Sequence, residues 1–196
     1  MRDAILAACR ADILFSCVDT AEGRHIADRL AAYFAMPLFD MGVSIPTRKG
    51  LGQDREIGEM CGRIDYVFPG GSTLLDRRVY DAAMLEAEYL APTAPDTHRQ
   101  KLAEGYLRGV EEQVPAVITL YMRTASDAVM EFIARAFPFQ HAPNGRQARN
   151  LFMLADSDAD VIAESDFAVS GTYPVAAGPR EPLLGLPALA ERRRAA

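Results

Sequence analysis

The sequence predicts an α/β fold built around a strand, a helix and a second strand within residues 11–45. Residues 12–18 (DILFSCV) form a nearly continuous apolar run, which is typical of a strand buried on both faces of a parallel sheet. In residues 21–34 the apolar side chains recur at helical spacing, and most charged side chains fall on the other side of the helix. Pro37 ends this helix and opens a second apolar run, residues 38–45. Two strands joined by a crossover helix of this length predict a right-handed βαβ unit.

The composition excludes several classes of function. A chain of 196 residues is long enough for a domain with a sizeable core, and its net charge of −6 argues against a broad nucleic-acid-binding surface. The arginines at 192–194 are interpreted as a solvated tail. No apolar run approaches the roughly 20 residues of a membrane span, and residues 1–12 lack the apolar core of a signal peptide. Three cysteines without CxxC spacing indicate free thiols, so the expected compartment is the cytoplasm.

Elements on either side of the βαβ unit follow from the same patterns. Residues 2–10 are expected to form a helix that leads into the first strand. The polar, glycine-bearing residues 46–60 are expected to form a loop. Residues 61–68 (CGRIDYVF) alternate as a strand does and predict an antiparallel hairpin with residues 38–45. A hard turn at 69–71 follows.

The middle of the chain predicts a helical excursion over residues 72–113. One helix is expected at 79–90 and a second at 97–111, with a break at 92–96. An excursion of this length between core elements is more often functional than filler.

The last third predicts one long helix, two short strands and a docked tail. Pro115 occupies the first turn of a helix that runs to about residue 136, and apolar side chains cover more than half of its circumference, so this helix is expected to be largely buried. Short strands are expected at 150–154 and 161–163, and an extended tail is expected to dock through Leu183, Leu184 and Leu186. The predicted organisation is a core at 1–71, the excursion at 72–113, the long helix with late strands at 114–170, and the tail at 171–196.

One stretch resembles a known family. The string ADILFSCVDTAEGRHIADRLAAYFAMPLFDMGV resembles the second half of the ThiF/MoeB/HesA family, the bacterial relatives of ubiquitin-activating enzymes. The shared pattern is an apolar strand that ends in Asp19, an arginine five residues later, and a proline-led strand ending in D-x-G-V. The strings CGRIDYVFPGGSTLLDR, VPAVITLYMRTASDAVMEFIARAFPF and GPREPLLGLP are similar to later parts of these adenylyltransferases. The resemblance implies a Rossmann-like, ThiF-type domain.

The resemblance also implies a reaction and its residues. The family uses ATP and Mg²⁺ to activate the C-terminal carboxylate of a ubiquitin-like or sulfur-carrier protein, with release of pyrophosphate. By this resemblance Asp19 and Arg24 are the catalytic residues, and Asp19 contacts the cofactor and the metal, since a hard carboxylate oxygen suits Mg²⁺. Gly42 and Val43 match the floor on which the partner's tail lies. Ligands outside the carboxyl ends of the strands are also what a parallel βαβ unit predicts.

Asp19 has an alternative role that its neighbours suggest. Asp19-x-x-Glu22 has the form of a capping box at the start of the helix, in which Asp19 would satisfy backbone N–H groups. The capping role and the site role are compatible, and both remain open at this point.

Some parts of the family pattern do not occur in these residues. The Gly-rich phosphate loop and the ribose-binding acid of the family precede the residue that Asp19 matches, and the 18 residues before Asp19 contain no such loop. We therefore expect a partial domain, lacking the N-terminal nucleotide-binding half, that uses ATP and Mg²⁺ only when a separate chain or a longer gene product supplies that half. No cysteine lies in residues 72–113, so neither zinc nor a thioester intermediate is expected.

Two further expectations concern partners and thiols. The strand at 12–18 would have an unpaired edge, which favours a complementing N-terminal chain or a homodimer. The alternative to an enzyme is a non-catalytic remnant that binds a modifier or dimerises through the excursion and the long helix. Cys17 is expected to be a core residue, and Cys61, at the start of a strand, to be more accessible but without a histidine nearby in sequence.

Overall fold

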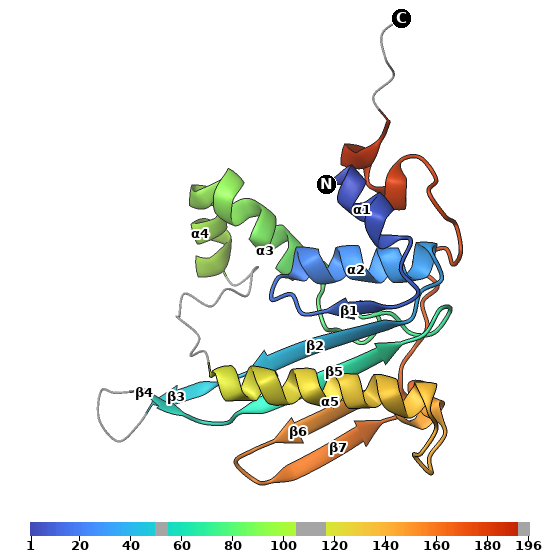
Figure 1. The fold of residues 1–196 in the computed structure, drawn as a ribbon. Helices are drawn as coiled ribbons and strands as arrows, with labels where there is room; N and C mark the ends of the chain where they lie inside the picture. The colour runs from blue at the N-terminus through green and yellow to red at the C-terminus, as the bar shows by residue number, and fades with distance from the viewer. Residues whose placement is uncertain (50–54, 105–116, 192–196) are drawn as a thin grey trace, which may run out of the picture.

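A computed structural model describes residues 1–49, 55–104 and 117–191. These residues form an α/β fold with a mixed sheet of five strands in the order β1-β2-β5-β6-β7 (Figure 1). Only β1 and β2 run parallel, and every other neighbouring pair in this sheet is antiparallel. No helix in the described part of the chain is both long and apolar enough to cross a membrane.

The predicted βαβ unit is confirmed. It consists of β1 Leu14–Ser16, α2 Ala21–Tyr33 and β2 Leu38–Ser44. Leu14 pairs with Leu38 and Ser16 with Asp40 in a parallel register. The expected strand at 12–18 is longer than the observed one, because the chain leaves the sheet after Ser16.

The antiparallel part begins with the predicted hairpin. β5 Cys61–Val67 pairs with β2 along its whole length. The expectation of a loop at 46–60 is wrong, since β3 Thr47–Lys49 and β4 Arg55–Ile57 pair as a two-stranded ribbon beyond β2 and β5. The two late strands are β6 Arg149–Met153 and β7 Asp158–Ile162.

The two faces of the sheet are covered by different helices. Because side chains alternate along a strand, Leu38 and Phe39 of β2 point to opposite faces. Leu38 packs in a cluster with Ala27 and Ala31 of α2, whereas Phe39 packs with Ala128 of α5 Ile118–Ala136. Helices α2 and α5 therefore lie on opposite sides of the sheet (Figure 1).

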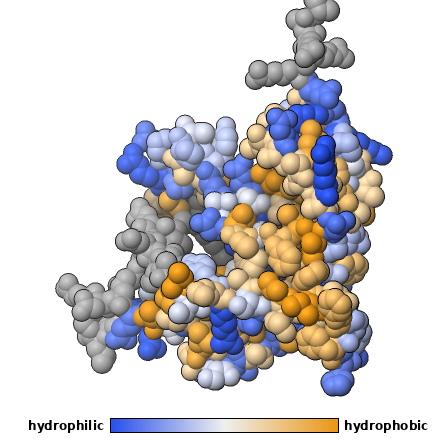
Figure 2. All heavy atoms as spheres, viewed as in Figure 1, coloured by the Kyte–Doolittle hydropathy of each residue, from blue (hydrophilic) through white to orange (hydrophobic). Residues whose placement is uncertain are grey.

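The expectation that the long helix is largely buried is wrong. Only Leu120, Thr124, Ala128 and Ala134 of α5 are buried. Met122 is 63% exposed and Met130 50% exposed, and Figure 2 shows apolar side chains gathered on the face of the molecule where α5 lies. The apolar pattern covers a wide arc of this helix, but the sheet contacts only one side of it.

The excursion contains α3 Ala82–Thr93 and α4 Pro95–Ala103. The first helix begins later than expected because Asp81 caps it, accepting a hydrogen bond from the backbone N–H of Met84 at 2.8 Å. Pro95 opens the second helix, a favoured position for proline. The part of the expected second helix beyond residue 104, and Pro115, lie outside the described residues.

The N-terminal helix and the tail pack together, as predicted for the tail. Helix α1 Arg2–Ala8 shares a cluster with Leu183 and Leu184, both with no exposed surface. Leu186 is partly buried against the same cluster, and the short turns η3 Leu183–Gly185 and η4 Pro187–Leu189 hold these side chains in place (Figure 1). Two further short turns are η1 Asn144–Arg146 and η2 Glu164–Asp166.

Candidate functional site

The structure brings all the sequence-predicted site residues together. Asp19, Arg24, Gly42 and Val43 line one cavity of about 340 Å³ at the carboxyl ends of β1 and β2. We call it the Asp19 cavity. Its remaining wall comes from Cys17, Val18 and Met41, and from Tyr121, Thr124 and Ala125 of α5. The cavity thus lies where the α/β topology predicts a ligand.

Asp19 does not cap helix α2. The N-cap is Thr20, whose Oγ1 accepts a hydrogen bond from the backbone N–H of Gly23 at 3.1 Å. Asp19 is exposed, and its carboxylate has no hydrogen-bond or ion-pair partner among the described residues. The capping interpretation of Asp19 is therefore wrong, and no structural role within the described fold accounts for its carboxylate.

Arg24 connects the turn after β1 to the sheet. Its Nη1 donates to the backbone carbonyl of Asp19 at 3.4 Å, and its Nε lies 3.5 Å from Oδ2 of the fully buried Asp40. The side chain of Arg24 is only 13% exposed. Arg24 thus fixes the backbone that carries Asp19 and places a positive charge at the cavity wall.

The first N–H groups of α2 are already occupied by a carboxylate. Glu88 of α3 accepts from the backbone N–H of Ala21 at 2.6 Å and from that of Glu22 at 2.9 Å. Unpaired N–H groups at a helix N-terminus form a common anion site, and here a side chain takes the place that a phosphate would take. Sequence reasoning missed Glu88, since nothing local relates it to residues 21 and 22.

The residues present fit Mg²⁺ only in company with a phosphorylated ligand. Asp19 supplies one exposed carboxylate, and Mg²⁺ in nucleotide sites takes one or two carboxylates together with phosphate oxygens. Within residues 1–49, 55–104 and 117–191, no group of three or more His, Cys, Asp or Glu side chains could hold a metal by itself. A resident metal centre therefore has no ligand set in this part of the chain.

The environment of Cys17 differs from the one expected from the sequence. Cys17 is exposed and lines the Asp19 cavity, because β1 ends one residue before it; the expectation that it belongs to the core is wrong. Partial burial, with a smaller contribution from the charge of Asp40, raises the pKa of the Cys17 thiol. Burial, then the charge of Glu59, likewise raises the pKa of Cys61. Neither thiol has the lowered pKa of a nucleophile.

A second cavity of about 320 Å³ adjoins the first, and Arg24, Gly42 and Val43 line both. Arginine side chains dominate its wall, so we call it the arginine cavity. They are Arg24 of α2, Arg63 of β5, Arg78 of the segment before α3, and Arg149 of β6. Four segments that are distant in sequence thus contribute the same type of side chain.

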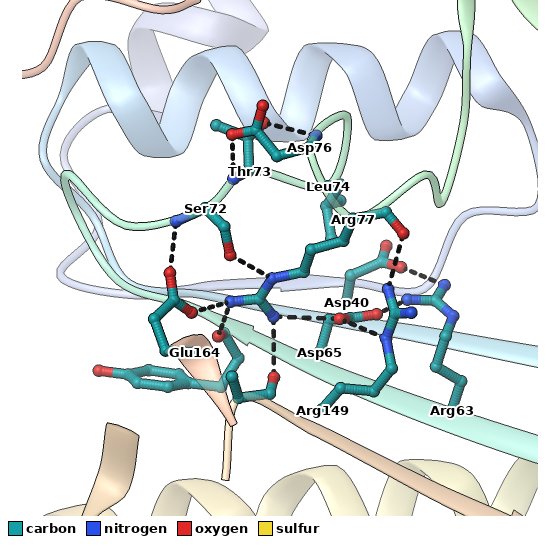
Figure 3. A network of polar contacts seen from close by, with 12 residues as sticks. Asp40, Arg63, Asp65, Ser72, Thr73, Leu74, Asp76, Arg77, Arg149 and Glu164 are labelled. Atoms are coloured by element: carbon teal, nitrogen blue, oxygen red, sulfur yellow. Dashed lines mark hydrogen bonds and ion pairs between the residues drawn. The ribbon is translucent and has the colours of Figure 1, made fainter. Parts of the chain in front are cut away.

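Buried carboxylates hold two of these arginines, Arg63 and Arg149, by hydrogen bonds (Figure 3). Asp40 and Asp65 have no exposed surface. Arg63 donates through Nη2 to Asp40 at 2.7 Å and through Nη1 to Asp65, while the Nε of Arg149 donates to Asp65 at 2.9 Å. Because the pairs are buried and hydrogen-bonded on several sides, the guanidinium groups have little freedom to move.

Arg77 is the buried member of the network and does not line the arginine cavity. It has hydrogen bonds to Ser72 at 2.8 Å, to Asp65 at 3.0 Å and to Glu164 at 2.7 Å, and further bonds to backbone carbonyls (Figure 3). Burial lowers the pKa of Arg77 to about 10, so it keeps its charge at neutral pH. With all its nitrogens in use, Arg77 is a structural residue.

Charged residues within the predicted strands are a sequence signal for this network. Arg63 and Asp65 stand two apart in a strand, so they point to the same face, and Asp40 interrupts an otherwise apolar strand. Charged residues inside buried strands are rare unless paired. Their partners, however, come from β6 and from residues 72–78, which no local pattern connects to them.

A buried polar cluster lies behind α2, away from both cavities. Oδ2 of Asp28 accepts from the Tyr80 hydroxyl at 2.9 Å, and Tyr80 lies 3.0 Å from the Tyr173 hydroxyl and 3.3 Å from Nδ1 of His25. Asp28 also accepts from the backbone N–H groups of Leu74 and Leu75. Burial raises the pKa of Asp28 to about 6. These bonds tie residues 72–80 to α2 and thereby position Arg77 and Arg78.

Comparison of the sequence with models of known protein families, and with curated proteins, gave no match.

Proposed function

We propose that the chain is the tail-binding part of a ThiF-type adenylyltransferase, which activates the C-terminal carboxylate of a ubiquitin-like or sulfur-carrier protein with ATP and Mg²⁺ in the cytoplasm. The observation that carries the proposal is that Asp19, Arg24, Gly42 and Val43, which the family pattern selects, line a single cavity. The nucleotide-binding half of the site is supplied by a partner chain or another segment.

Each residue has a role that its surroundings support. Gly42 and Val43 form the floor on which the tail would lie. The free carboxylate of Asp19 would hold Mg²⁺ together with phosphate oxygens, and the ion would neutralise phosphate charge there. Arg24 orients the Asp19 turn and offers a positive charge to the carboxylate of the tail.

Tail binding is tested with a fluorescently labelled peptide of small residues that ends in a free carboxylate, with the C-terminally amidated peptide as a control. We expect the free acid to bind about tenfold more tightly, since a charge-assisted hydrogen bond contributes roughly 1.5–3 kcal/mol. In Gly42→Ala the new Cβ would lie 2.7 Å from Nη2 of Arg63, so Arg63 would have to shift, the floor would be distorted and this variant should bind the free acid more weakly. Gly145→Ala, with no atom within 4 Å of its Cβ, is the matched control. Equal affinity for the two peptides would contradict the proposal.

The origin of the nucleotide half is tested by reading the genomic DNA upstream of Met1. An in-frame continuation with a GxGxxG motif supports the catalytic form of the proposal. A stop codon or an unrelated gene there supports a separate complementing chain or the second candidate.

The second candidate is a non-catalytic module that dimerises, and the exposed apolar side of α5 favours it. Ile118 is 73% exposed, Met122 63% and Met130 50%, all on one helix. Exposed apolar side chains that are contiguous mark interaction surfaces. Light scattering at tens of micromolar tests it: a dimer that Met122→Lys with Met130→Lys converts to a monomer supports the module, and a monomeric wild-type chain contradicts it.

A further inference from the structure

We propose that the arginine cavity is a binding site for a phosphate-class anion, a tetrahedral group with at least two negative charges. The site differs from the tail site proposed above in its ligand and in Arg63, Arg78 and Arg149, which do not line the Asp19 cavity. Residues that sequence reasoning left out form most of it.

The network around the cavity carries a net positive charge. Its arginines, Arg24, Arg63, Arg77, Arg78 and Arg149, are accompanied by the three carboxylates of Asp40, Asp65 and Glu164. The carboxylates lie behind the cavity wall, and Asp40 and Asp65 have no exposed surface. Among these groups the positive charges exceed the negative ones by two, and all of the arginines except Arg77 line the cavity.

Some arginine donors in this network have no hydrogen-bond acceptor among the described residues. Arg78 is exposed at the cavity wall, and its guanidinium makes no hydrogen bond or ion pair to any other described residue. The Nε of Arg24 is buried without a hydrogen-bond partner, since its 3.5 Å approach to Asp40 is an ion pair only. A buried unpaired donor costs free energy, whereas the exposed guanidinium of Arg78 can donate directly to an oxyanion in the cavity.

The backbone of Arg78 is held in an unfavourable conformation. Its φ of 56° is in the left-handed region, which costs a residue other than glycine free energy. The conformation persists because the surrounding bonds fix it: its own N–H donates to the carbonyl of Leu75 at 3.0 Å, and Arg149 donates to the carbonyl of Arg77 at 3.2 Å. A strained residue at a cavity wall is typical of a functional position.

The ligand class follows from shape and charge. A guanidinium presents a rigid fork of donors that matches phosphate and carboxylate oxygens, and two surplus charges favour a dianion over the single charge of a carboxylate. The volume of about 320 Å³ is at the lower end of the range for small-molecule sites, so the ligand is small. Free inorganic phosphate, pyrophosphate and the phosphoryl groups of a nucleotide share this chemistry.

Titration calorimetry in low-salt buffer without a divalent metal tests the site. The ligands are sodium pyrophosphate, sodium phosphate, ADP and, as the monoanion control, sodium acetate. We expect pyrophosphate and phosphate to bind at least tenfold more tightly than acetate. ADP binding as tightly as pyrophosphate would identify a nucleotide as the source, whereas pyrophosphate alone would identify the free anion.

Variants distinguish the cavity from general attraction to the protein. Arg78→Gln removes a guanidinium that holds no other residue, so it should fold normally and weaken pyrophosphate binding about tenfold, as expected for a lost charge-assisted contact. Arg10→Gln, an exposed arginine outside both cavities, should leave affinity unchanged. Equal affinity of the two variants for pyrophosphate, or acetate binding as tightly as phosphate, would overturn the proposal. The peptide assay above is unaffected by either result.

Discussion

Two halves of the same sheet face are built from opposite kinds of side chain. On the face covered by α2, the amino-terminal end of β2 contributes Leu38, opposite Val67 of β5, to a dry apolar cluster. One step further, Asp40 lies opposite Asp65, and the next pair is Gly42 and Arg63 at the cavities. Along one face, β2 and β5 therefore contribute first to the apolar core, then to the ion network, and then to the open cavities.

The apolar half and the charged half stabilise the fold differently. The apolar cluster gains free energy from burial alone. The ion network gains little net free energy, because desolvation offsets the attraction, but it loses much when one member is removed. The ion network makes the site rigid, because Asp40 and Asp65 fix the guanidinium groups of Arg63 and Arg149 at the wall of the arginine cavity.

The largest expected effect comes from breaking the charged half. Asp65→Ala removes the shared partner of Arg63, Arg77 and Arg149. Arg63 then keeps only Asp40 and Arg77 only Glu164, while Arg149 loses the one carboxylate that pairs with it among the described residues. We expect the free energy of unfolding to fall by about 3–5 kcal/mol, measured by urea denaturation. Asp160→Asn, on the exposed strand β7, is the control and should change it by less than about 0.5 kcal/mol. A loss below about 1 kcal/mol for Asp65→Ala would show that the network does not hold the sheet.

Breaking the apolar half should cost slightly less and spare the site. Leu38 has no exposed surface, so Leu38→Ala should lower the free energy of unfolding by about 3 kcal/mol through lost burial and a residual cavity. Because Leu38 lies outside both cavities, pyrophosphate affinity at a temperature where the variant is folded should match the wild type. Val161→Ala, 52% exposed on β7, is the control. A parallel loss of affinity and stability would mean that the two halves are not independent.

The pH dependence sharpens the comparison through Asp28, which joins the apolar half to the segment carrying Arg77. Its pKa is raised from 3.8 to about 6 in the folded chain, mainly by burial, so the native state binds the proton more tightly than the unfolded state. The contribution of Asp28 to the free energy of unfolding should therefore fall by about 2–3 kcal/mol as the pH rises from about 4 to about 6.

The measurement compares wild type with Asp28→Asn by urea denaturation across this pH window. The difference between the two curves isolates Asp28 from carboxylates such as Glu59 and Asp76, whose pKa values are lowered and whose effect has the opposite sign. A difference that stays constant between pH 4 and 6 would rule out the raised pKa.

Local patterns were sufficient to predict the βαβ unit, the β2–β5 hairpin and the docked tail. In residues 21–34 the apolar side chains recur at helical spacing. Leu183 and Leu184 are apolar side chains in an extended tail, which indicates that the tail docks on the body, and both are buried. Asp19 and Gly42 were predicted both from their position at strand ends and from the family pattern, whereas Arg24 and Val43 were predicted from the family pattern alone.

The failures have physical causes. A one-residue shift separates a cap at Asp19 from the observed cap at Thr20, and both residue types are good caps. The apolar period of α5 predicts a helix that buries a face, but it does not say how much of that face the chain itself covers. The arginine cavity depends on which strands are neighbours, so Arg63 and Arg149 could not be brought together from local sequence.

The smallest expected effect concerns Glu88 of α3, which accepts hydrogen bonds from the first backbone N–H groups of α2. While this carboxylate is in place, those donors cannot hold a phosphate, and no Gly-rich loop is present in the described residues; we expect ATP·Mg²⁺ to bind the wild-type chain no more tightly than about millimolar. Glu88→Ala should free both donors and tighten ATP·Mg²⁺ severalfold, at a stability loss of about 1 kcal/mol for the helix terminus. Glu86→Ala, on the same helix as Glu88, is the matched control, because it removes only an exposed ion pair with Lys101 of α4. Calorimetry on chains that also carry Arg78→Gln, which weakens the arginine cavity, decides. Micromolar affinity with Glu88 in place would mean that a nucleotide site is complete without the α2 terminus, and equal affinity of the Glu88 and Glu86 variants would mean that Glu88 is only a structural cap.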